Sequence, residues 1–178
     1  NAAGGNTIAS DGTDTNGGRI TIDDNIIVSG SGSGDLELVA DSDIQINATL
    51  QNLTGDGDLT LHSQTGVTLG NSGAISWDPG STGFVDIISS QSGGLSGSGS
   101  INISSGKFKV NTSALVPPLY TGSIALSSGT TFEKRGTGGF RLKPSSSSNQ
   151  FNRIELYEGI LALANDDALG TSYSGSIE

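Results

Sequence analysis

Two stretches decide the fold: "GSGDLELVA" at residues 32–40 and "GDGDLTLHS" at residues 55–63. Both contain the phrase Gly-Asp-Leu-x-Leu, in which apolar and polar residues alternate. Such alternation, bounded by Gly, Asn, Ser and Asp, predicts a short β-strand. The early return of the phrase, from Gly34 to Gly57, indicates an internal repeat.

The phrase recurs along most of the chain. It begins at Gly18, Gly34, Gly57, Gly83, Gly99 and Gly122, with looser copies at Gly139 and Gly175. The intervals are uneven, short from Gly83 to Gly99 and longer from Gly57 to Gly83. Further alternating runs occupy residues 44–46, 67–69, 108–110 and 160–163. Helical spacing is nearly absent, and only residues 163–170 could hold a turn or two of helix.

Two all-β folds fit this pattern. A sandwich or barrel of antiparallel strands does not require identical phrases at matching positions. A parallel β-solenoid does, because each coil lies about 4.8 Å above the last and equivalent residues stack. We therefore predict a single-stranded right-handed parallel β-helix of about six to eight coils over residues 19–178, with residues 1–18 an irregular lead-in or partial coil.

The solenoid predicts two columns of stacked aliphatic residues inside the protein. The first would contain Ile20, Leu36, Leu59, Val85, Ile101 and Ile124, and the second Ile22, Leu38, Leu61, Ile87, Ile103 and Leu126. The residues between them, Thr21, Glu37, Thr60, Asp86 and Asn102, would face outward. In this interpretation a short interval between phrases is a lean coil, and a longer one is a coil with an extra strand or loop.

Composition narrows the class of protein. The net charge is −10, and residues 1–106 hold one basic residue, Arg19, against twelve acidic ones. This acidity argues against nucleic acid as a partner, because binding to phosphates requires a basic surface. The chain has no Met, no signal peptide and no apolar run long enough to cross a membrane, and it ends by restarting the repeat phrase. We expect an internal segment of a longer chain, and the absence of Cys is compatible with export.

Two parts of the chain resemble known families of exported bacterial proteins. Residues 30–70 resemble the repeats of filamentous-haemagglutinin-like exoproteins, with Gly-Asp-Leu-x-Leu followed by Ile-x-Ile-Asn. Residues 136–170 resemble the passenger-associated transport repeat of bacterial autotransporters. This second match consists of a Gly-rich start, a strand around Leu142, Asn149 and Phe151, the run 158–161 and the closing "DALG" at residues 167–170. Its middle, "NQFNRIELYEG", is more charged than the family pattern.

These resemblances imply a right-handed parallel β-helix at the surface of a Gram-negative bacterium, or secreted from it. They also imply C-terminal coils that assist folding, and a tether through a C-terminal outer-membrane barrel outside this sequence, or secretion through a separate partner. We expect a non-catalytic segment that acts as an adhesin stalk or binding face, with host or matrix glycans or proteins as partners and no cofactor. The alternatives are a polysaccharide-cleaving enzyme on the same fold and a self-assembling matrix or sheath protein.

Carboxylates are the candidates for catalysis or metal binding. β-Helix enzymes cleave polysaccharides with surface Asp and Glu, and the candidate pairs here are Asp23/Asp24, Asp35/Asp58, Asp41/Asp43 and Asp56/Asp58. Asp after Gly can instead bond to its turn backbone. Residues 55–59 form a single partial copy of a calcium-binding nonapeptide, which acts only when repeated, so no metal site is predicted. His62, the only histidine, should face solvent without catalytic partners.

Basic residues gather in the later coils, at Lys107, Lys109, Lys134, Arg135, Arg141 and Lys143. Lys107 and Lys109, like Arg141 and Lys143, flank apolar residues that should point inward, so these four should point outward. We predict these four as candidate contacts to acidic glycans or matrix. The alternative is a solvated face that discourages pairing at strand edges.

Overall fold

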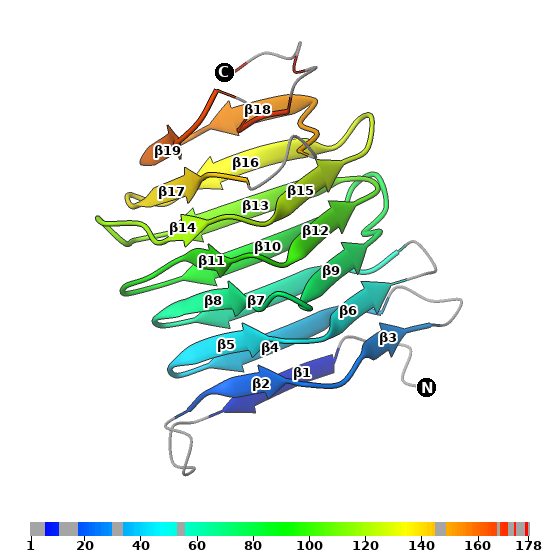
Figure 1. The fold of residues 1–178 in the computed structure, drawn as a ribbon. Helices are drawn as coiled ribbons and strands as arrows, with labels where there is room; N and C mark the ends of the chain where they lie inside the picture. The colour runs from blue at the N-terminus through cyan, green and yellow to red at the C-terminus, as the bar shows by residue number, and fades with distance from the viewer. Residues whose placement is uncertain are drawn as a thin grey trace.

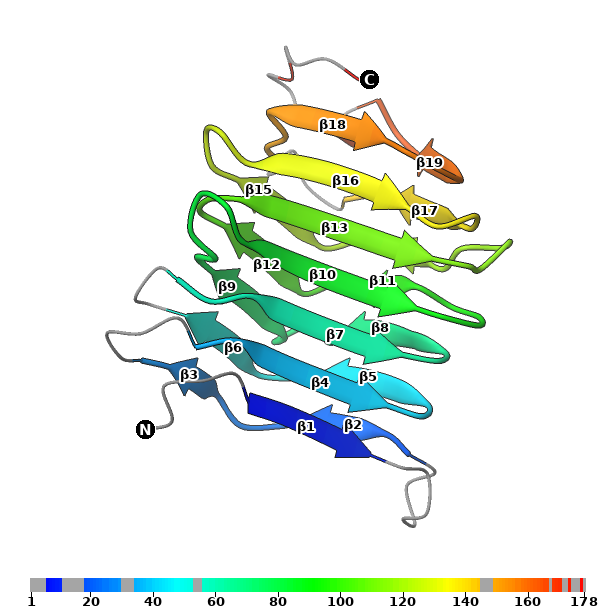
Figure 2. The ribbon, with the colours of Figure 1, turned by 180° about the vertical axis from the view of Figure 1, so that it is seen from behind.

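The computed structural model describes residues 6–10, 18–29, 34–52, 56–144, 149–166, 168–170, 173 and 177. The chain forms a parallel β-solenoid of about six turns that winds in a right-handed sense (Figures 1 and 2). The predicted fold class is confirmed, and the sandwich is not formed. No helix occurs among the described residues: Leu163 ends the last strand, and the described residues from 164 to 170 form bends and turns.

Three parallel sheets form the faces of the solenoid, here called sheets A, B and C. Sheet A contains β1 (Asn6–Ser10), β4 (Leu36–Ala40), β7 (Leu59–Ser63), β10 (Phe84–Ser89), β13 (Lys107–Thr112), β16 (Thr131–Arg135) and β18 (Arg153–Leu156). Sheet B contains β2 (Ile20–Ile22), β5 (Asp43–Ile46), β8 (Gly66–Leu69), β11 (Leu95–Gly97), β14 (Leu119–Tyr120), β17 (Gly139–Leu142) and β19 (Ile160–Leu163). Sheet C contains β3 (Ile26–Val28), β6 (Thr49–Asn52), β9 (Ala74–Trp77), β12 (Ser100–Ile103) and β15 (Ser123–Leu126).

We number the coils by their strand in sheet A, so that coil 1 begins with β1 and coil 7 with β18. Coils 1 to 5 each supply one strand to every sheet. In coil 6 the third strand is replaced by a bridge between Ala125 and Gln150. In the incomplete copy at Gly175, the described residue Ile177 forms a bridge with Ile154 of β18. The stacking therefore continues to the last described residue.

The predicted columns are wrong, although all twelve of their residues pack in or against the core. Leu36, Leu59 and Val85 do stack in sheet A, but their column continues through Phe108, Phe132 and Ile154. Ile20 lies beside Ile44 in sheet B, and Ile101 lies between Ile75 and Ile124 in sheet C. Each predicted column thus joins residues from three faces, because every face requires the same apolar-polar-apolar phrase.

The strand pairing shows how long one coil is, and it corrects our interpretation of the intervals between copies of the repeat phrase. One full coil leads from Leu36 to Leu59, and the next from Leu59 to Val85, since these residues are paired in sheet A. The short interval instead leads from one face to another, as from Val85 in sheet A to Ile101 in sheet C. The predicted lean coil therefore does not occur among the described coils.

The interior changes from aliphatic to aromatic along the solenoid. Leu and Ile dominate the buried residues of coils 2 to 4, with Trp77 as the exception. In coils 5 and 6, Phe132 lies at the centre of an aromatic cluster, with ring centroids 5.6 Å from Phe108, 5.9 Å from Phe140 and 5.4 Å from Phe151. Such pairs add to the free energy of burial, so these coils should be the hardest to unfold.

We predict that Phe132→Ala lowers the free energy of unfolding by about 3–5 kcal/mol, because it removes a buried ring and leaves a cavity. Urea denaturation followed by circular dichroism measures this loss. Thr131→Ala, on the outward face of the same strand, is the control and should cost under about 1 kcal/mol. Equal losses in the two variants would show that the aromatic cluster does not stabilise these coils.

Candidate functional site

The aspartates of the repeat phrase bind the backbone of the next coil. Asp58 N donates to Asp35 Oδ1 at 2.8 Å, and Phe84 N donates to Asp58 Oδ1 at 2.7 Å. Each carboxylate therefore satisfies an amide at the start of the strand stacked on its own. This gives the Asp of the repeat phrase a structural role. The sequence suggested a bond to the backbone of its own turn, whereas the observed bond is to the neighbouring coil.

Replacement of Asp58 tests this role. We expect Asp58→Ala to destabilise the chain by about 1–2 kcal/mol, because it leaves the Phe84 amide without its acceptor. Asp58→Asn keeps an acceptor oxygen and should cost less. Hydrogen exchange, measured residue by residue, should accelerate most at the Phe84 amide in Asp58→Ala; unchanged exchange there would contradict the assignment.

Two of the other candidate carboxylates are also engaged by a side chain of a neighbouring coil. Asp23 accepts a bond from Asn47 Nδ2 at 2.8 Å, and Asp43 accepts one from Arg19 Nε at 2.8 Å. No cluster of three or more His, Asp or Glu side chains suited to a metal ion occurs among the described residues. Gly55, the first residue of the partial calcium motif, lies outside the described residues.

Charged and aromatic side chains gather on the outer surface of sheet A. We call the outward side chains of β10, β13, β16 and β18 the charged face; these strands lie side by side in Figure 2. Register places Lys107, Thr131 and Arg153 in one outward column. A second column contains Asp86, Lys109, Glu133 and Glu155. His62, also outward on sheet A, lies beside Ile88 at the edge of this area.

Glu133 is the centre of the charged face. Its side chain has no exposed surface, yet it points outward, because Lys107 Nζ covers it at 2.5 Å and Arg135 Nε at 2.8 Å. The Lys107 and Arg135 side chains remain 46% and 40% exposed. Burial acts to raise the pKa of Glu133, but the hydrogen bonds from Lys107 and Arg135 outweigh it, so the pKa is lowered. Glu133 is therefore a buried anion that holds two cations at the surface.

The network continues into coil 7. The Arg135 guanidinium lies over the Tyr157 ring, 4.2 Å from its centroid. Tyr157 donates from its hydroxyl to Glu155 at 2.7 Å, and Arg153 Nη2 contacts Glu155 at 2.9 Å. Three successive coils are thus linked across their outer surface by one chain of charge-assisted contacts.

Coil 4 contributes an aromatic and an acidic residue to the lower edge of this face. The Lys109 ammonium lies 3.6 Å from the centroid of the Phe84 ring. Asp86 has a buried oxygen, Oδ1, with no hydrogen-bond partner among the described residues. Burial raises the pKa of Asp86, and the charges of Lys109 and Arg135 oppose this effect only in part.

The four predicted contact residues point outward but do not share a surface. Lys107 and Lys109 are on β13 in sheet A, whereas Arg141 is on β17 in sheet B and Lys143 directly follows the end of that strand. Sequence reasoning missed Glu133, Arg153 and Tyr157 as neighbours of the first pair. The correct coil length would have shown them, since positions 109, 133 and 155 are one coil apart and stack in one column.

Lys134, also among the basic residues noted in the sequence, points inward and is fully buried. It occupies the column of Leu61, Ile87 and Val110. Its ammonium donates to the carbonyl oxygens of Arg135, Gly136 (2.9 Å) and Glu158 (3.4 Å). It thereby ties the corner of coil 6 to the corner of coil 7.

Earlier coils close the same corner with hydroxyl groups. Ser63 Oγ accepts from Gly66 N at 3.1 Å, Ser89 Oγ donates to Ser92 O at 2.7 Å, and Thr112 Oγ1 donates to Gly93 O at 3.2 Å. In coil 6 the next residue in this series is Gly136, which has no side chain to do so. Lys134 supplies the donor from two positions earlier.

This substitution of an ammonium for a hydroxyl predicts a pH-dependent stability. Burial lowers the pKa of Lys134 to about 8, from 10.5 in the unfolded chain. Between these values the unfolded chain binds more protons, so the free energy of unfolding should rise with pH by up to about 1.4 kcal/mol per pH unit. Denaturation at pH 7 to 9.5 should show this rise in the natural chain and a flatter curve in Lys134→Met. Parallel curves would contradict the lowered pKa.

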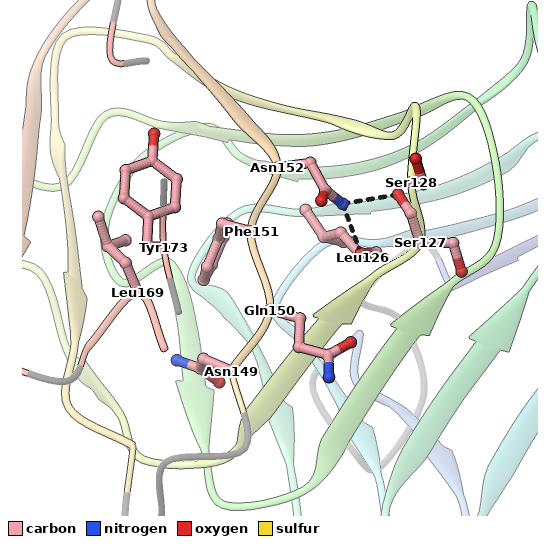
Figure 3. A pocket seen from close by; sticks show the side chains of 9 residues that line it. All are labelled: Leu126, Ser127, Ser128, Asn149, Gln150, Phe151, Asn152, Leu169 and Tyr173. Atoms are coloured by element: carbon pink, nitrogen blue, oxygen red, sulfur yellow. Dashed lines mark hydrogen bonds between the residues drawn. The ribbon is translucent and has the colours of Figure 1, made fainter. Parts of the chain in front are cut away.

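Two shallow depressions lie away from the charged face. One, of about 260 Å³, lies at the C-terminal end of sheet C (Figure 3) and is lined by Leu126, Ser127, Ser128, Asn149, Gln150, Phe151, Asn152, Leu169 and Tyr173. Here Asn152 Nδ2 donates to Leu126 O at 2.7 Å and Ser127 O at 2.8 Å, so this amide holds the coil together. The other, of about 370 Å³, lies along the corner of sheets A and B beside Gly66, Gly93 and Gly94.

Comparison with protein-family models, curated protein sequences and solved structures finds no match to the chain. The described residues contain no helix of the length and apolar character required to cross a membrane.

Proposed function

We propose that this chain is a non-catalytic segment of a large exoprotein, surface-exposed or secreted, that acts as a rigid stalk and presents the charged face to an extracellular ligand. One observation carries the proposal. A continuous network covers the outside of three coils, where it adds nothing to the apolar core. Its members are Glu133, Lys107, Arg135, Tyr157, Glu155 and Arg153.

The architecture supports the stalk. Each coil contacts only its neighbours, so the structure lengthens by one strand separation per coil and needs no contacts between distant coils. The resemblance of residues 136–170 to the autotransporter passenger repeat supports export from a Gram-negative bacterium. That segment contains β17 of coil 6 and β18 and β19 of coil 7, and β18 carries Arg153 and Glu155 of the network.

The polysaccharide-cleaving alternative has one observation in its favour. Asp86 and Glu133 stand in one outward column with Lys109 between them, and their pKa values are shifted in opposite directions. Such a divergence is typical of paired catalytic carboxylates. However, Glu133 has no exposed surface and is held by two cations, so its carboxylate cannot reach a sugar. We therefore favour binding without cleavage.

An array of acidic glycans, neutral glycans and matrix proteins tests the proposal, with each spot measured at low and at physiological salt. We expect saturable binding by the natural chain that weakens in Lys107→Ala/Lys109→Ala, and no new reducing ends in bound polysaccharide. Absence of binding to every spot would overturn the binding face. Release of reducing ends that stops in Glu133→Gln would establish the enzyme instead.

A further inference from the structure

The charged face separates its charges by depth. The Lys107, Arg135 and Arg153 side chains are 46%, 40% and 50% exposed. Their carboxylate partners Glu133 and Glu155 are 0% and 16% exposed. Solvent therefore meets the cations, and the anions lie beneath them. In a chain of net charge −10, this is a local surface on which an anion can bind.

The three cations come from three successive coils. Lys107 and Arg153 belong to one column with Thr131 between them, so their backbones are about 9.5 Å apart along the solenoid axis. Arg135 lies in the coil between them, two positions along its strand from Glu133. The three residues thus form a triangle, one in each of coils 5 to 7, and the charged groups of Lys107 and Arg135 meet at Glu133.

The side chains of this triangle are fixed in place before any ligand binds. Glu133 holds Lys107 and Arg135, Glu155 holds Arg153, and the Tyr157 ring supports Arg135. Fixed side chains lose little entropy on binding, which favours recognition of a ligand with regularly spaced charges. Tyr157 itself is 57% exposed and offers part of its ring to the same ligand.

We propose that this triangle binds a linear acidic polysaccharide that runs along the solenoid axis. The inference rests on the proposed function and names the ligand class of the same face. An extended polymer of uronic acid carries one carboxylate per ring, and one ring advances the polymer by nearly the separation of adjacent coils. Lys107 and Arg135 then meet one ring beside Glu133, and Arg153 meets the next ring beside Glu155, one coil further along. A sulfated polymer with the same spacing offers the same chemistry.

Oligosaccharides of defined length test the proposal by fluorescence anisotropy with the full 178-residue chain. One arm uses oligogalacturonates and the other heparin-derived oligosaccharides, which distinguishes carboxylate from sulfate as the bound group. Affinity should rise with length and level off at about four rings, because the triangle spans only three coils. Affinity that rises without limit, or equal affinity for neutral dextran oligomers, would overturn the proposal.

Matched variants test whether the ligand binds on sheet A. Lys107→Gln/Arg153→Gln should weaken binding about tenfold or more at low salt, since each cation makes a charge-assisted contact. Arg141→Gln/Lys143→Gln removes the same charge from sheet B and should change affinity less than twofold. Arg153→Gln alone, which leaves both partners of Glu133 in place, should also weaken binding and guards against misfolding of the double variant.

Two outcomes separate this inference from the proposed function. Equal losses in the sheet A and sheet B variants would mean that only net charge matters and would overturn the axial site. A natural chain that binds matrix proteins or neutral glycans on the array, but neither oligosaccharide series, would overturn the ligand class while the binding face stands.

Discussion

In-register parallel stacking is the constraint on which the rest of this structure depends. Every strand lies about 4.8 Å from its equivalent in the next coil, so each side chain meets its counterpart directly. Inside, this places aliphatic on aliphatic and aromatic on aromatic, as in the column Leu36, Leu59, Val85, Phe108 and Phe132. Outside, the same rule would place like charges together if the polar residue of the phrase were repeated.

The outer surface of sheet A avoids that repulsion by changing the residue at each coil. Asp86, Lys109 and Glu133 alternate in sign along one column. Glu133 and Glu155 are adjacent and alike, and here Lys107, Arg135 and Arg153 supply the opposing charges. Sheet C avoids the repulsion by carrying no outward charges. Its outward residues from β6 to β15 are Thr49, Gln51, Ala74, Ser76, Ser100, Asn102, Ser123 and Ala125. Of these two sheets, sheet A therefore carries the charged side chains.

The fold could be predicted from the sequence, but its register could not. Strands follow from local alternation, and runs such as 44–46 and 67–69 are strands in the structure. Register requires knowing which copies of a phrase share a face, and Val85 and Ile101 begin equivalent phrases on different faces of one coil. The strands at 26–28 and 153–156 lack the leading Gly of the phrase, and without them the sequence gives too short a coil.

Because the register could not be predicted, most of the candidate site could not be predicted either. Lys107 and Lys109 can be found from composition and alternation alone, because both properties are local. Glu133 and Lys134 are neighbours in sequence, and alternation alone sends one outward and the other inward. What alternation cannot supply is their partners: the cations over Glu133 come from coils 5 and 6, and the carbonyl oxygens around Lys134 from the corners of coils 6 and 7.

Strand β16 therefore carries two buried charges of opposite sign on its two faces, and each has partners in its own coil and in one neighbouring coil. A buried charge without a partner is costly, so each fixes the placement of the coil that pairs with it. Glu133 orders the outer surface and Lys134 closes the inner corner. Coils 5 to 7 are thus held together by specific polar contacts as well as by the aromatic core. Glu133 thereby holds Lys107 and Arg135 in place on the outer surface of sheet A.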